Sequence, residues 1–67
     1  MLVEIEADQT WETPRRVYYK VTDDLGAIHH YGPVFAAPDF DPEAHKAVVA
    51  AKIAESLAQA EFEQVIG

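Results

Sequence analysis

The sequence predicts a small α+β domain in which a three-stranded antiparallel β-meander packs, as a second layer, against one long C-terminal α-helix. Three observations support this fold class. Two segments alternate apolar and polar residues with the period of a half-buried strand, a glycine-containing turn leads into a third segment, and the last third of the chain is rich in helix-forming residues. The chain has 67 residues, so we expect residues 1–67 to form a single domain.

The first predicted strand covers residues 2–7, where apolar residues alternate with acidic ones. The alternation is lost before Trp11, and Pro14 ends regular strand pairing shortly afterwards. Two interpretations of Trp11 are open. It forms a lid over one end of the core, or it is an exposed anchor at an interface, where tryptophan is over-represented among binding hot spots.

Residues 15–22 form the clearest predicted strand, with Val17, Tyr19 and Val21 on one face. A tight turn that ends at Gly26 leads into a partner strand over residues 27–31. The following Gly-Pro pair is expected to interrupt this third strand. A fourth short strand at Val34–Phe35 is left open.

The register of this hairpin decides which histidine faces the core, because a slip of one residue exchanges the two faces of a strand. We expect Val21 to lie opposite Ile28, since this register keeps apolar residues together. It pairs Tyr19 with His30 on the core face. The outer face would then combine aromatic and basic side chains on an otherwise acidic protein, and its members are Arg16, Tyr18, Lys20, His29 and Tyr31.

That combination has three readings. Tyrosine and arginine are enriched at the centres of protein interfaces, which favours a protein partner. Stacking and phosphate contacts with single-stranded nucleic acid would use the same residue types. A solvated antiparallel sheet face, on which aromatic rings shield cross-strand pairs, would also show them.

The predicted helix covers residues 42–66. Asp41 is a good N-cap, Pro42 suits the first helical position, and Phe40 precedes the cap where it can act as a hydrophobic staple. The composition from Ala44 onwards is dominated by strong helix formers.

The helix carries more apolar surface than is needed to cover one side of a small sheet. The stripe expected to face the sheet consists of Val49, Ile53, Leu57 and Ala60, and a second apolar edge consists of Val48, Ala51, Ala58, Phe62, Val65 and Ile66. In one interpretation the alanines are helix filler and Phe62 folds back onto the sheet. In the other, Phe62, Val65 and Ile66 form a docking surface for another chain.

Composition narrows the classes of partner. The chain has 12 acidic and 5 basic residues, a net charge of −7, and no cysteine. The charge opposes direct binding of nucleic acid and favours a basic partner, and the absence of cysteine excludes disulfides. A chain this small buries only about 60% of its unfolded surface, so we expect homo-oligomerisation or assembly with protein partners.

The sequence offers little for chemistry. His29, His30 and His45 invite a metal hypothesis, but adjacent residues of a strand point to opposite faces and cannot bind one ion together. Ser56 is the only serine and lies in the predicted helix, and no phosphate-binding glycine loop is present. We therefore expect no catalytic residue, metal, cofactor or small-molecule substrate, and no enzyme. A small metal-dependent enzyme is the third-ranked possibility.

The first ten residues are charged and alternating, unlike a signal peptide, and no apolar stretch approaches the length of a transmembrane segment. We expect no contact with a membrane and a cytoplasmic or otherwise intracellular location at synthesis.

A resemblance is carried by the run Asp24-Leu25-Gly26-Ala27-Ile28-His29-His30-Tyr31-Gly32-Pro33, followed by Asp41-Pro42 and an alanine-rich helix that ends in Glu61-Phe62-Glu63. This order resembles certain short open reading frames among phage morphogenesis genes, over roughly two-thirds of the chain. The resemblance implies a virion or assembly component and transfers no catalytic residue.

We therefore expect a non-enzymatic structural or adaptor protein inside a larger protein assembly, such as the tail, baseplate or capsid of a phage virion. The alternative is an acidic inhibitor that blocks a basic groove of a nucleic-acid-handling host enzyme, and its mark would be acids gathered in one row. The candidate interface residues are Trp11, Arg16, Tyr18, Lys20, His29, Tyr31, Phe62, Val65 and Ile66.

Overall fold

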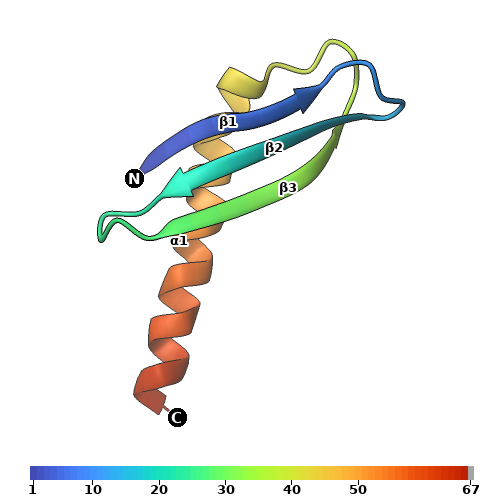
Figure 1. The fold of residues 1–67 in the computed structure, drawn as a ribbon. Helices are drawn as coiled ribbons and strands as arrows, with labels where there is room; N and C mark the ends of the chain where they lie inside the picture. The colour runs from blue at the N-terminus through green and yellow to red at the C-terminus, as the bar shows by residue number, and fades with distance from the viewer. Residues whose placement is uncertain (67) are drawn as a thin grey trace.

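The computed structural model describes the backbone of residues 1–66 and the side chains of residues 1–59. Over this range the elements are β1 (Leu2–Gln9), β2 (Arg15–Thr22), β3 (Ile28–Ala36) and α1 (Pro42–Ile66). The strands form an open antiparallel sheet in the order β1-β2-β3, and α1 crosses one face of it (Figure 1). The predicted fold class is confirmed.

Strand β1 continues to Gln9, two residues beyond the predicted end. The reason is a bulge: Ile5 pairs with Tyr19 and Ala7 with Tyr18, so the register shifts between Ile5 and Ala7. A bulge breaks the alternation on which a strand is recognised in a sequence. It also exchanges the faces of the residues that follow it, which brings Asp8 to the face that α1 covers.

Strand β3 is longer than predicted, because Gly32 and Pro33 do not end it. The register shifts here, and pairing resumes with Val34 opposite Val17. Gly32 has a φ of 141°, a conformation that glycine adopts readily. The open fourth strand at Val34–Phe35 is the second half of β3, and the Gly32-Pro33 peptide bond within it is cis.

The predicted hairpin register is wrong by one residue. Val21 pairs with His29, where we expected Ile28, and the same shift applies along the hairpin. His29 and Tyr31 therefore lie on the core face, whereas Ile28 and His30 lie on the outer face.

The carboxylate of Asp23 explains this register. Its Oδ1 accepts hydrogen bonds from the backbone N–H groups of Leu25 and Ala27, both at 2.9 Å, which shapes a five-residue loop over residues 23–27. Its Oδ2 lies 2.8 Å from His29 Nε2. These local bonds hold His29 on the core side and leave Ile28 exposed, although apolar patterning favours the opposite arrangement.

The start of α1 is as predicted. Asp41 Oδ1 accepts hydrogen bonds from the backbone N–H groups of Glu43 at 3.1 Å and Ala44 at 3.4 Å. Phe40, directly before the cap, packs against His45 with the ring centroids 5.1 Å apart. This is the hydrophobic staple, which fixes the angle at which the chain enters the helix.

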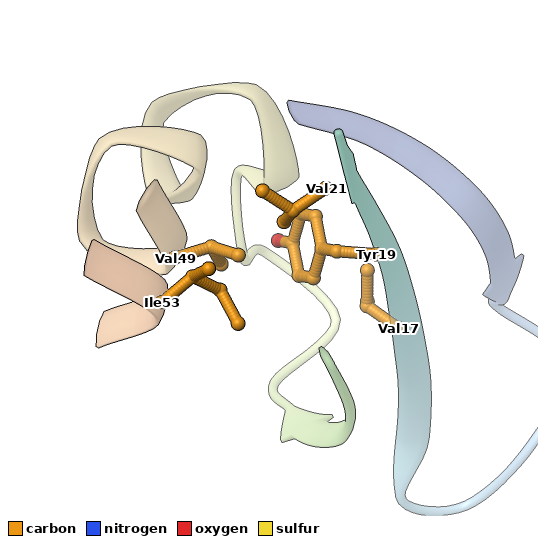
Figure 2. Packing of buried hydrophobic residues seen from close by; sticks show 5 residues of the cluster. All are labelled: Val17, Tyr19, Val21, Val49 and Ile53. Carbon is orange, nitrogen blue, oxygen red and sulfur yellow. The ribbon is translucent and has the colours of Figure 1, made fainter. Parts of the chain in front are cut away.

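The core lies between α1 and the sheet, mainly over β1 and β2 (Figure 2). Val49 and Ile53 of the predicted helix stripe are buried and Leu57 is half-buried, as expected, while the side chain of Ala60 lies outside the described residues. The buried residues are Val17, Tyr19, Val21, Val49 and Ile53. The second half of α1 runs past the sheet (Figure 1).

Replacing Gly32 by alanine is expected to destabilise the protein by about 2 kcal/mol or more. The new Cβ would lie 2.9 Å from the Val17 carbonyl oxygen, and the positive φ adds backbone strain. Urea unfolding followed by circular dichroism measures the loss.

Gly26→Ala is the matched control, because Gly26 also has a positive φ, 85°, but nothing lies within 4 Å of the added Cβ. Its cost should be confined to backbone strain, about 1 kcal/mol. Equal losses for the two variants would contradict the close approach of Gly32 to β2.

Candidate interaction site

The face of the sheet opposite α1, here called the outer face, is not covered by another element of the described chain (Figure 1). Strand pairing places its side chains in rows across the sheet. From one end to the other, these rows are Leu2–Thr22–Ile28, Glu4–Lys20–His30, Ala7–Tyr18 and Gln9–Arg16–Phe35.

Large apolar side chains lie at both ends of the outer face. Leu2 and Ile28, on either side of Thr22, are 58% and 55% exposed. At the opposite end Phe35 is 63% exposed, and Trp11, in the turn from β1 to β2, is 75% exposed. These ends differ from the polar pattern that is usual for the solvated face of an antiparallel sheet.

The charges in the middle of the outer face are matched within it. Lys20 Nζ lies 4.0 Å from Glu4 Oε1, and His30 Nδ1 lies 3.1 Å from Glu6 Oε2. With Arg16 included, the face carries two acids and two bases, so its formal charge is zero. The excess of acids that gives the chain its charge of −7 therefore lies elsewhere.

Arg16 differs from the other cations of the sheet. It lies beside Phe35, its Nε is buried without a hydrogen-bond partner, and no ion pair reaches it among the described residues. A desolvated N–H without a partner costs free energy. Arginine is one of the residue types enriched among binding hot spots.

The neighbouring Arg15 lies on the core side and donates four hydrogen bonds. Its Nε and Nη2 donate to the two carboxylate oxygens of Asp8, at 2.8 and 2.6 Å. Its Nη1 donates to the carbonyl oxygens of Pro38 and Phe40, both at 3.1 Å. This hydrogen bonding from Arg15 lowers the pKa of Asp8 below its usual value.

Tyr19 joins the sheet to the first turn of α1. Its hydroxyl donates to the Pro42 carbonyl oxygen at 3.3 Å and lies 3.2 Å from His45 Nδ1. Its ring packs against those of Tyr31 and His45, at centroid distances of 6.4 and 5.7 Å. Burial raises the pKa of the Tyr19 hydroxyl. These contacts hold the first turn of α1 against the sheet.

The predicted interface residues fall into three groups. Arg16, Tyr18 and Lys20 share the outer face as expected, while His29 and Tyr31 do not and lie on the core side. Trp11 is exposed, so its interpretation as a lid over the core is wrong. The side chains of the helix-end candidates lie outside the described residues, and these are Phe62, Val65 and Ile66.

Sequence reasoning missed Leu2, Ile28, His30 and Phe35 as members of this face. Phe35 reaches the outer face through the shift in register at Gly32, since unbroken alternation from His30 would have placed Val34 there. Ile28 and His30 depend on the register of the hairpin, for which the sequence offered Asp23 as the only signal.

The two adjacent histidines point to opposite faces, as expected, and bind different carboxylates, those of Asp23 and Glu6. Within the described residues, no three histidine, aspartate or glutamate side chains cluster closely enough to hold a metal ion. Nor does the described part of the chain contain a helix long and apolar enough to cross a membrane.

Comparison with known protein families, curated proteins and solved structures finds no match for this chain.

Stability should fall as the pH drops below about 4, because the folded state lowers the pKa of both Asp8 and Asp23 from 3.8. The main cause is the hydrogen bond from Arg15 to Asp8 and the one between His29 and Asp23. A carboxyl group whose pKa is lower in the folded state than in the unfolded state contributes its full stabilisation of the fold at pH values above its unfolded pKa. This stabilisation is lost as the pH falls through the pKa of the folded state. Urea midpoints measured from about pH 7 to about pH 2.5 follow the loss.

Asp23→Asn should be less stable at neutral pH and show a smaller decline on acidification. Asp39→Asn, a change at an exposed acid in the connection before α1, should keep the wild-type decline. Identical pH profiles for Asp23→Asn and the wild type would contradict the role given to the His29–Asp23 contact.

Proposed function

We propose that this chain is a non-enzymatic structural or adaptor protein that works inside a larger protein assembly and makes contact through its outer face. The observation that carries the proposal is the exposure of Leu2, Ile28 and Phe35 on a sheet face that no element of the described chain covers. Tyr18 lies between these apolar ends and Arg16 lies beside Phe35, and both residue types are enriched at interfaces.

The size of the core supports the same proposal. Only five side chains are buried among the described residues. The sequence contains no cysteine, so no disulfide stabilises this small core. A domain this small is marginally stable without a staple, and contact with another chain supplies the missing burial. The outer face is the sheet face that no element of the described chain covers.

The finer assignment, to a phage virion, rests on the sequence resemblance of residues 24–33 and of the helix. We propose a phage particle as the first assembly in which to look for this chain.

The alternative, an acidic inhibitor, requires acids gathered in one unpaired row. On the outer face Glu4 and Glu6 each lie next to a base. Of the other exposed acids, Asp24 pairs with the N-terminal ammonium group, Asp41 caps α1 and Glu43 pairs with Lys46. The exposed acids that remain among the described residues lie in a turn, a connection and the helix, and these are Glu12, Asp39 and Glu55. This distribution favours the assembly function, and salt-sensitive binding to a nucleic-acid-handling enzyme would favour the inhibitor.

Site-specific photo-crosslinking tests the assembly function. A benzoylphenylalanine at Tyr18, in the middle of the outer face, should form adducts with other protein chains when the protein is expressed in its native source. The same group at Ala51, exposed on α1, is the matched control and should give at least about threefold less adduct.

Purification of the Tyr18-labelled protein from that source, as an unlinked monomer after irradiation, would overturn the proposed function. Equal adducts from Tyr18 and Ala51 would show that the outer face is not the contact.

A further inference from the structure

We infer that the outer face binds the outer face of a second copy of this chain, so that two sheets pack face to face with the helices outside. The inference rests on the proposed function and deepens it by naming the first partner. Three properties of the structure support it: charge, the placement of apolar residues and the chemistry of the sheet edges. The available area sets the strength of the contact.

Charge favours a second copy at this face. Two copies of a protein with a net charge of −7 repel one another over most of their surface. The outer face carries Glu4, Glu6, Arg16 and Lys20, so it is formally neutral and adds no net repulsion of its own. Because Glu4 and Glu6 already lie beside Lys20 and His30, burial of the face leaves these acids with a partner.

The apolar residues are placed for self-complementary contact. Leu2 and Ile28 lie at one end of the outer face and Phe35 at the other. Consider a twofold axis that lies between the two sheets and runs perpendicular to the strands at their midpoint. It brings the Phe35 end of each copy over the Leu2–Ile28 end of the other. Both apolar ends are then covered by one operation, and side chains of facing sheets interdigitate over a separation of about 10 Å.

The available area sets the strength of this dimer. Three strands about 4.8 Å apart and about 27 Å long present roughly 400 Å² per copy, or roughly 800 Å² for the pair. The exposed Trp11 turn extends the face at one end. Specific, stable interfaces begin near 1,200 Å², so we expect a reversible dimer that forms at micromolar to millimolar concentration.

The sheet edges are less suitable for self-association. Pairing of β1 with β1 of a second copy about Ile5 would place Glu4 opposite Glu6 of that copy, and like charges directly opposite are destabilising. The edge of β3 contains Pro33, which has no N–H to donate. The outer face remains the favoured contact.

Sedimentation velocity on the purified full chain, from about 10 µM to about 1 mM, tests the inference. The dimer fraction should rise with protein concentration. It should also rise between about 0.05 M and about 0.5 M NaCl, because salt screens the repulsion between two acidic copies. A dimer weakened by salt would indicate that bases of the outer face meet acids elsewhere on the second copy, which would overturn face-to-face packing.

Phe35→Glu should weaken dimerisation by at least about tenfold, since it replaces a large apolar contact at one end of the outer face by a carboxylate that has to be desolvated. Val48→Glu is the matched control: Val48 is 46% exposed on α1, away from the outer face, and the variant should dimerise like the wild type within about twofold. Circular dichroism checks the fold of both. If Phe35→Glu does not fold, Ile28→Glu makes the same test from the opposite end.

A monomer at the highest concentration in both salts would overturn the inference, as would equal dimerisation of Phe35→Glu and Val48→Glu. The outcome is separable from that of the proposed function. The purified chain could be monomeric and still form Tyr18 adducts with a different protein in its native source. That result would contradict the dimer and would still support the assembly function.

Discussion

The guanidinium of Arg15 joins three segments that would otherwise be independent, and the position of α1 depends on it. It binds Asp8 at the end of β1 through two hydrogen bonds and the connection before α1 through two backbone carbonyl groups. A planar, permanently charged group with several fixed donors is suited to this task, and lysine could not replace it. Asp8 reaches this side of the sheet only because the bulge between Ile5 and Ala7 shifts the register. The irregularity in β1 is therefore what allows the sheet to hold the entry into the helix.

A single helix can cover one face of a three-stranded sheet, and the order of elements leaves no further segment in the described chain for the other face. Arg15 and Arg16 show the consequence at adjacent positions. The first is on the covered face with its hydrogen bonds to Asp8 and the connection, and the second is on the outer face with a buried Nε that lacks a partner. The same alternation separates buried Tyr19, which holds the first turn of α1, from Tyr18 on the outer face. One face of β2 therefore packs against α1 and stabilises the fold, and its other face contributes to the candidate interface.

Patterns with a strong physical basis predicted most of the fold. The N-cap at Asp41, the staple at Phe40 and the apolar stripe through Val49 and Ile53 follow from helix geometry and were confirmed. The failures arose where hydrogen bonds between side chain and backbone outweigh apolar patterning. Asp23 fixes the loop and pulls His29 to the core side, and Gly32 lets β3 continue through a shift in register. The alternation of apolar and polar residues in the sequence predicts neither effect.

The register error also concealed the character of the site. The expected register placed Ile28 in the core and Tyr31 outside, which describes a polar, aromatic surface. The observed register exchanges them, and together with Phe35 it gives the outer face an apolar residue at each end of β3. A formally neutral face with exposed apolar residues at its ends, on a protein of charge −7, is costly to leave in water but adds no net repulsion towards a second copy of itself. Binding at this face would therefore depend on the burial of apolar area, with the charges of the remaining surface acting to oppose it.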